Sequence, residues 1–162
     1  KAHIMVAVLG EEEKLLERGK LFTKALAVCC KQKYATGIYT SGVVFEPRFY
    51  EGLADMMKED ELPIFNWVWF GLYRREGGLN GYTYGMDVFG KEEMEVLNTD
   101  AEPEELRDFL ASLASYVLAC DVTLQDGETI GFSADDKHTI TRSPGVSLPE
   151  EQMTLKLSLI HI

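Results

Sequence analysis

Basic residues are scarce in this chain. Its 162 residues include 16 Lys and Arg against 27 Asp and Glu, which gives a formal net charge of −11. Nucleic-acid binding depends on contacts between phosphates and Lys or Arg, and anionic membrane surfaces attract the same cations. The charge therefore argues against nucleic acid and membrane as partners. It favours a basic protein partner; the alternative is that it serves only solubility.

Cysteine is also rare. The three cysteines are Cys29, Cys30 and Cys120, an odd number, and adjacent cysteines rarely bridge each other. All three fall on apolar faces of expected helices, so we expect them to be reduced core residues. Because reduced thiols are typical of the cytosol, we expect a cytoplasmic protein.

Several recurrent site motifs are missing. Cys29 and Cys30 lack the two-residue gap of a zinc-binding pair, and the three histidines lie far from them in the sequence, at positions 3, 138 and 161. No expected helix follows the glycines of residues 77–81, as a phosphate-binding loop requires. Ser41 lacks the preceding glycine of a nucleophile elbow. We therefore expect no metal site, no cofactor and no catalytic residue.

No apolar run has the length of a membrane span. The first run, residues 3–9, is also too short for a signal peptide. Its nearly continuous apolar character predicts a strand buried on both faces. An amphipathic helix over 11–33 and a strand over 36–40 follow, so we expect an N-terminal β-α-β unit with parallel strands and a right-handed crossover.

The rest of the chain predicts an antiparallel sheet with two more amphipathic helices. The second helix runs from Pro47 to residue 62. Residues 64–73 are apolar on both faces, which predicts a central strand; a loop over 76–81 and strands over 82–89 and 94–97 complete a β-meander. The third helix begins either at a capping box over residues 99–102 or at Pro103. Short strands are expected over 129–132, 137–141 and 154–160. Together these elements predict a single α+β domain over residues 1–162, with a mixed, mostly antiparallel sheet and three amphipathic helices.

The glycine- and tyrosine-rich stretch is Gly81-Tyr-Thr-Tyr-Gly-Met-Asp-Val-Phe-Gly-Lys-Glu-Glu-Met-Glu-Val96, and it follows an aromatic run over 65–73. Together with Tyr39-Thr-Ser-Gly42 and Gly127-Glu-Thr-Ile-Gly131, it resembles a bacterial family described as domain of unknown function 4261. The resemblance extends over residues 3–132 and assigns no catalytic residues. It implies further sequence before the segment like residues 3–9, so we expect the chain to be the C-terminal part of a longer natural protein.

One candidate ligand site lies around Ser41, Gly42 and Arg48. A glycine-containing turn shortly before a helix exposes backbone N–H groups that can bind an anion. The alternative is an ordinary turn followed by a helix cap.

A second candidate site comprises Asn66, Arg74, Tyr84 and Asp87 on the expected meander. Tyrosines beside glycines can form a shallow groove that a ligand or a peptide backbone approaches. The alternative is that the aromatic rings cover the glycines in a packed sheet.

The paired acids Glu92-Glu93 and Glu104-Glu105 are interpreted as solvated charges, because adjacent residues do not face each other on a strand or helix. The leading hypothesis is a non-enzymatic binding or regulatory domain of a bacterial cytoplasmic protein. Its acidic face would engage a basic protein, as in an adaptor or an immunity-type inhibitor. The alternative is a small-molecule sensor or enzyme that uses the Ser41 turn and the Tyr84 strand.

Overall fold

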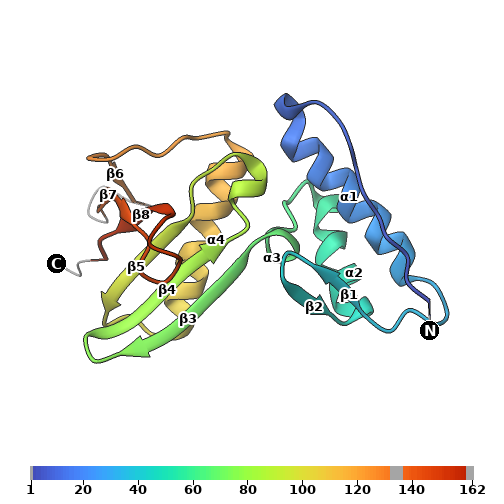
Figure 1. Ribbon diagram of the computed structural model, residues 1–162, viewed down its shortest axis with the longest axis horizontal. Helices are drawn as coiled ribbons and strands as arrows, with labels where there is room; N and C mark the ends of the chain where they lie inside the picture. Colours follow the sequence, from blue (N-terminus) through green and yellow to red (C-terminus); the bar gives the residue numbers. More distant parts are fainter. Residues whose placement is uncertain (1, 132–136, 160–162) are drawn as a thin grey trace. The chain divides into compact units, whose positions relative to one another are not determined.

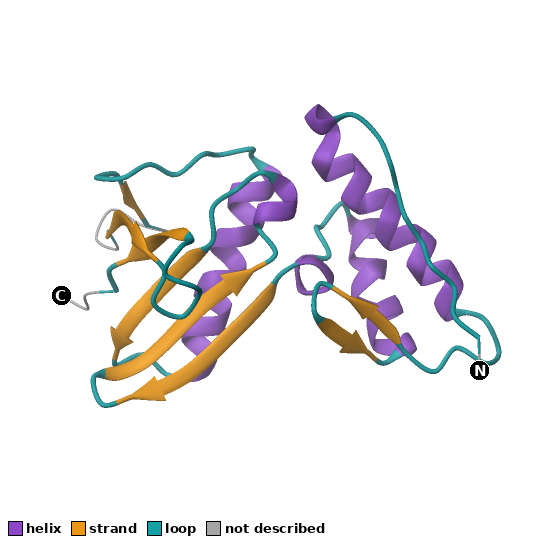
Figure 2. Cartoon of the chain, viewed as in Figure 1, coloured by secondary structure: helices purple, strands orange, loops and turns teal. Residues whose placement is uncertain are grey.

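The structure, a computed structural model, describes residues 2–131 and 137–159. The chain divides into two compact units, residues 1–69 and 70–162 (Figure 1 and Figure 2). Unit 1 combines helices with a small hairpin, and unit 2 combines a six-stranded sheet with one long helix. The α+β class is therefore confirmed, whereas a single domain stays a prediction.

Unit 1 consists of three α-helices, two short 3-10 helices and one hairpin. In chain order its elements are η1 (Glu12–Lys14), α1 (Leu15–Cys30), β1 (Ile38–Thr40), β2 (Val43–Phe45), α2 (Pro47–Ala54), η2 (Asp55–Glu59) and α3 (Ile64–Trp67). Pro47 occupies the first turn of α2, where a backbone N–H has no hydrogen-bond partner within the helix, so a residue without an N–H is tolerated. The carboxylate of Glu46 accepts a hydrogen bond from the N–H of Phe49 at 2.8 Å and caps the same helix. The first two predicted amphipathic helices are thus present, with shorter bounds.

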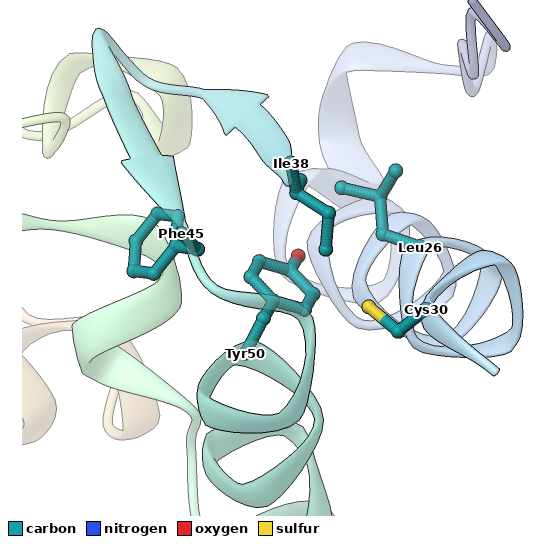
Figure 3. Close-up of a cluster of buried hydrophobic side chains, with 5 residues drawn as sticks. All are labelled: Leu26, Cys30, Ile38, Phe45 and Tyr50. Atoms are coloured by element: carbon teal, nitrogen blue, oxygen red, sulfur yellow. The ribbon is translucent and has the colours of Figure 1, made fainter. Parts of the chain in front are cut away.

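The core of unit 1 forms where α1, the hairpin and α2 meet. Figure 3 shows Leu26 and Cys30 of α1 and Ile38 of β1 directed toward Tyr50 of α2. Phe45 of β2 packs edge-to-face on Tyr50, with ring centroids 5.3 Å apart. Burial raises the pKa of Tyr50 to about 12, so this phenol stays neutral in the core.

The predicted N-terminal β-α-β unit is wrong in its first strand. Residues 3–9 form no strand, and β1 pairs antiparallel with β2 around Ser41 and Gly42 instead of lying parallel to residues 3–9. β1 belongs to a two-stranded hairpin with β2, and residues 3–9 do not pair with it. Of the apolar run, Val6 packs against the core, while Met5 and Leu9 are exposed.

The predicted central strand over 64–73 is also corrected. Residues 64–67 form one helical turn, α3, and the strand begins only at Trp69. Ile64 and Trp67 are buried at helical spacing in unit 1, and the indole N–H of Trp67 donates to the hydroxyl of Thr23 at 2.7 Å. An apolar run fits a strand or a helix equally well, and here contacts with α1 favour the helix.

Unit 2 is built on a mixed six-stranded sheet in the order β3-β4-β5-β8-β7-β6. Its strands are β3 (Trp69–Arg75), β4 (Gly78–Tyr84), β5 (Met94–Thr99), β6 (Thr129–Ile130), β7 (His138–Pro144) and β8 (Met153–Leu157), and η3 (Asp87–Phe89) follows β4. β5 and β8 are parallel, and β4–β5, β6–β7 and β7–β8 are antiparallel. The meander is confirmed, but β3 is an edge strand and the predicted loop over 76–81 shortens to two residues.

The long helix α4 (Pro103–Ala119) packs against one face of this sheet (Figure 1). A side chain at Gly81 would meet Leu106 and Leu110 at 2.9–3.0 Å, so the helix lies close against β4. The helix starts at Pro103, and the carboxylate of Glu105 accepts from the N–H of Glu102 at 3.3 Å. The predicted capping box over 99–102 is thus replaced by one that begins at Glu102. The last residues of two predicted strands, position 132 of 129–132 and position 160 of 154–160, lie outside the described residues. His161 lies outside them as well.

The three cysteines differ in exposure. Cys30 is buried, Cys29 is half-buried and Cys120 is exposed, so the prediction of a core position is wrong for Cys120. This residue lies at the C-terminal cap of α4, beyond the last buried turn. The three cysteines form no disulfide with one another in the structure, and their reduced state stays a prediction.

We expect Cys120 to react first with a disulfide reagent in the native protein, and Cys30 last. Burial raises the pKa of the Cys30 thiol, with a further contribution from Glu51, and the thiolate is the reactive form. Timed labelling with mass spectrometry measures the order, and the unfolded protein should yield all three thiols. A native protein in which Cys30 reacts as fast as Cys120 would contradict the described core of unit 1.

Candidate functional site

Two buried carboxylates lie at the start of β5. Glu93 precedes this strand and is 1% exposed, and Glu95 lies within it and is 0% exposed. The interpretation of Glu93 as a solvated charge is therefore wrong. A buried carboxylate requires hydrogen bonds or a counter-charge, and the chain supplies them in two different ways.

Glu93 binds the turn that follows β4. One carboxylate oxygen accepts the N–H groups of Gly85 at 2.7 Å and Met86 at 2.9 Å, and the other accepts the Thr83 hydroxyl at 2.7 Å. Burial raises the pKa of Glu93, and these hydrogen bonds oppose the rise. The carboxylate fixes a turn in which Gly85 has a φ of 119°, a conformation that favours glycine.

Glu95 binds the loop between β7 and β8. Its carboxylate accepts three successive N–H groups of residues 146–148 at 2.6–3.2 Å, an arrangement known as an anion-binding nest. It also accepts the Thr154 hydroxyl at 2.9 Å and lies 2.8 Å from the ammonium of Lys156. Burial alone opposes ionisation, but Lys156 and the N–H donors outweigh it, so the pKa of Glu95 is lowered.

The loop held by Glu95 also contacts an aromatic pair on β3 and β4. The hydroxyls of Tyr73 and Ser147 are 2.9 Å apart, and the amide of Asn80 donates to the Tyr73 hydroxyl at 3.1 Å. The ring of Tyr82 lies over Gly71, where an added Cβ would come within 2.2 Å of it. Gly71 is thus covered by an aromatic ring, as the packing alternative stated, whereas Gly81 is covered by Leu106 and Leu110 of α4.

The first candidate site divides between a turn and a helix. Ser41 and Gly42 are the two central residues of the β1–β2 hairpin, with φ values of 51° and 75°. Positive φ at both positions is typical of the type I′ turn, whose twist matches that of the flanking strands. Arg48 is exposed in the first turn of α2.

The residues of the second candidate site are not brought together within one unit. Asn66 is 2% exposed in α3 of unit 1, and its amide donates to the carbonyl of Tyr50 at 3.2 Å. The other three lie in unit 2, where Tyr84 is 48% exposed. The ring of Tyr82 on β4 covers Gly71 on β3, so these two residues lie on one face of the sheet. Side chains alternate along a strand, which places Tyr84 on that same face and Arg74 on the opposite face. Asp87 is exposed and accepts from the N–H of Val88 at 2.9 Å.

Exposed acids gather where α4 begins. The buried side of the helix carries Leu106 and Leu110, and the opposite side faces solvent. Arg107 lies among the acids, 3.7 Å from Glu104 and 2.9 Å from Asp108. We call this exposed set the acidic cluster of α4; its members are Asp100, Glu102, Glu104, Glu105 and Asp108. Glu104 and Glu105 are thus solvent-facing, as the sequence indicated.

Other ionic contacts stabilise the surface of unit 2. Arg142 contacts Glu92 at 2.6 Å, which raises the pKa of the guanidinium. Lys91 contacts Asp121 at 2.7 Å and lowers the pKa of that carboxyl. Within residues 2–131 and 137–159, no three side chains of His, Cys, Asp or Glu gather as ligands for a metal ion. None of the helices in the same ranges has the length and hydrophobicity that a membrane span requires.

Sequence reasoning missed Glu93, Glu95 and Lys156 as structurally important polar residues. A signal was present in the pattern of the two strands. Glu95 is flanked by the apolar Met94 and Val96, and Lys156 is flanked by two leucines at positions 155 and 157. The register places Glu95 directly beside Lys156, so matched opposite charges on two apolar strands were the available clue.

Residues 82–158 match the model of a family described as Domain of unknown function (DUF4261). The matched segment runs from within β4 to just beyond β8 and contains Glu93, Glu95 and the loop that Glu95 binds. None of the curated proteins and none of the solved structures compared with the chain matches it. The resemblance stated from the glycine- and tyrosine-rich stretch is thereby confirmed for this part of the chain.

Proposed function

We propose that this chain is a non-enzymatic protein-binding or regulatory domain of a bacterial cytoplasmic protein, of the adaptor or immunity type. The observation that carries the proposal is the acidic cluster of α4, a set of five exposed acids of which two, Glu104 and Asp108, contact Arg107. An exposed set of one sign attracts a partner surface of the opposite sign and accelerates its association. The partner would therefore be a protein with a basic face.

The hydrogen bonds of the buried carboxylates support a non-enzymatic role. Glu93 and Glu95 receive their hydrogen bonds from the chain's own turns and loops. A general acid or base must reach a proton of the substrate, whereas these two groups are directed at backbone N–H groups inside the fold. Their perturbed pKa values are explained by their role in holding loops.

The cytoplasmic location is part of the same proposal. Its support is that Cys29, Cys30 and Cys120 are free thiols, because disulfides are rare in the cytosol and common in secreted proteins.

The experiment is quantitative capture from a bacterial lysate with two charge-reversal variants. The test variant is Glu104→Lys with Asp108→Lys, two exposed members of the acidic cluster of α4. The control is Glu59→Lys with Glu61→Lys, two exposed acids of unit 1 that give the same change in net charge. Glu92 and Glu93 are not changed, because one pairs with Arg142 and the other is buried.

We expect basic proteins on the wild-type chain and on the control, and a loss of these proteins on the test variant. Exposed charges contribute little to stability, so both variants should fold. Capture should weaken with salt, because the screening length falls to about 8 Å at physiological ionic strength. Capture that survives the reversal at Glu104 and Asp108, or no captured protein at any salt concentration, would contradict the proposal and favour the small-molecule alternative.

A further inference from the structure

One face of the β3–β4 hairpin carries a row of aromatic side chains. The two-residue turn between these strands places Trp69, the first residue of β3, opposite Tyr84, the last residue of β4. The contact between the Tyr82 ring and Gly71 fits the same register. Opposed residues share a face, and the leucines of α4 cover Gly81 on the other face of the sheet (Figure 2). We call Trp69, Tyr82 and Tyr84, which lie on the face away from α4, the aromatic row.

The members of the aromatic row differ in exposure. Tyr82 is half-buried over Gly71 and has a packing role. Trp69 and Tyr84 are each 48% exposed, although they are directly opposed on neighbouring strands. These two side chains therefore present ring surface to the solvent at the same end of the hairpin.

The same face of β3 already holds one cation over an aromatic ring. Side chains alternate along the strand, so Tyr73 and Arg75 share a face with Trp69. The guanidinium of Arg75 lies 5.3 Å from the centre of the Tyr73 ring, within the range of a cation–π contact. Within residues 2–131 and 137–159, no lysine or arginine lies over the rings of Trp69 and Tyr84. The face thus offers two further ring surfaces that the chain's own cations do not cover.

The charge of unit 2 favours a cation over other ligands that stack on rings. Residues 70–162 contain 17 Asp and Glu against 7 Lys and Arg, so this unit carries almost all of the net charge of the chain. The exposed acid Asp87 follows Tyr84 by only three residues. Nucleobases also stack on aromatic side chains, but their phosphates depend on Lys and Arg contacts. The field around the aromatic row therefore attracts cations and repels nucleic acid.

We propose that Trp69 and Tyr84 bind arginine side chains of a basic protein segment. The guanidinium lies over the ring faces, where the negative charge of the π-systems is concentrated. The surrounding acids attract the segment to this face of the sheet. The proposal rests on the proposed function for the nature of the partner, and it gives that partner a second contact besides the acidic cluster of α4.

The first test is a titration of the full, isotope-labelled chain with two short peptides, followed by NMR. One peptide alternates arginine and serine; the other has citrulline in place of each arginine, which keeps a planar head group but removes its charge. We expect the indole N–H signal of Trp69 and the amide signal of Tyr84 to shift with the arginine peptide only. Equal shifts with both peptides would show that the rings stack without regard to charge, and would overturn the proposal.

The second test removes the rings. Trp69→Leu with Tyr84→Leu keeps apolar side chains but no aromatic face, and should weaken binding of the arginine peptide about tenfold. Trp69→Phe with Tyr84→Phe keeps two rings and should retain most of the affinity. The matched control, Tyr39→Leu with Tyr116→Leu, removes two exposed rings from β1 and α4 and should bind as the wild-type chain does. Circular dichroism checks that all three variants are folded.

Several outcomes overturn the proposal. They are unchanged binding after the leucine substitutions at Trp69 and Tyr84, an equal loss in the control, and a wild-type chain that binds neither peptide. A deoxythymidine oligonucleotide is added in a parallel titration and should leave the Trp69 signal in place; a shift would assign the aromatic row to nucleic acid instead.

The variant Glu104→Lys with Asp108→Lys separates a failure of this contact from a failure of the proposed function. If this variant loses the arginine peptide while the leucine variant at Trp69 and Tyr84 keeps it, the acidic cluster of α4 binds the cations and the aromatic row does not. If the leucine variant loses the peptide but the wild-type chain captures no basic protein from the lysate, the contact stands and the proposed function fails.

Discussion

Trp67→Ala is expected to lower the free energy of unfolding by roughly 3–5 kcal/mol, the usual cost of truncating a buried aromatic side chain. Trp67 is 5% exposed, and its indole N–H donates to the hydroxyl of Thr23, which is itself fully buried. That hydroxyl in turn donates to the carbonyl of Gly19 at 2.9 Å. The substitution therefore leaves a cavity and also breaks a buried hydrogen-bond chain. Urea unfolding followed by circular dichroism measures the loss.

Two further variants separate the effect of the cavity from the effect of the lost hydrogen bond. Trp67→Phe keeps most of the apolar volume but removes the indole N–H, so it should cost about 1–2 kcal/mol from the lost hydrogen bond. Trp69→Ala removes the neighbouring tryptophan, which is 48% exposed, and should cost less than Trp67→Ala. An effect of Trp67→Ala below about 1 kcal/mol is outside the range for core truncations and would place this ring outside the core of unit 1.

The elements with clear periodicity were predicted well from the sequence. The helical spacing of Leu106, Leu110 and Leu113 predicted α4, and those residues are fully buried on the sheet. The glycines and the alternation over 82–89 predicted the meander, although the strand over 82–89 is wrong in its second half, because β4 ends at Tyr84 and residues 87–89 form the 3-10 turn η3. In these segments the local pattern and the tertiary contacts demand the same structure, so the sequence is sufficient.

Two errors arose where an apolar pattern fits more than one structure. Residues 64–67 have the composition of a strand, but Ile64 and Trp67 are three positions apart and both bury themselves as one helical turn. Residues 3–9 have the pattern of a buried strand, but forming a strand requires an edge to pair with. Whether such an edge is present depends on residues far away in the sequence or on another chain.

The candidate site was predicted less well, because its important contacts are non-local. An acid usually faces water, so Glu93 gave no sign of burial, and the clue for Glu95 lay in its match with Lys156 on a strand some sixty residues later. Glu95 is buried because the loop over 146–148 lies across it, some fifty residues later in the chain. The exposure of Cys120 has a simpler cause, since it follows the last residue of α4 and its position depended on the helix boundary.

Glu95→Ala is expected to lower the free energy of unfolding by about 3–5 kcal/mol at neutral pH, the range for removing one partner of a buried ion pair. The ammonium of Lys156, whose side chain is 14% exposed, then loses its carboxylate. The three N–H groups of residues 146–148 lose their acceptor as well. Chemical denaturation of the wild-type and variant chains at neutral pH measures the difference, and Glu95→Gln is the control that keeps the size of the side chain without its charge.

The difference between the two chains should shrink as the pH falls. The pKa of Glu95 is lower in the folded chain than in the unfolded chain, so the unfolded chain binds the proton more readily. The stabilisation from Glu95 is therefore complete above the ordinary glutamate pKa of about 4.3 and is lost as the pH falls through the folded value. Glu93 has the opposite effect on the pH dependence of stability. Burial raises its pKa in the folded chain, so its contribution to the free energy of unfolding is lost as the pH rises. Glu93 is present in both chains, so subtracting the two stability curves leaves the contribution of Glu95. A difference that is the same at pH 7 as at about pH 3 would show that the Glu95 carboxylate is not ionised in the folded protein.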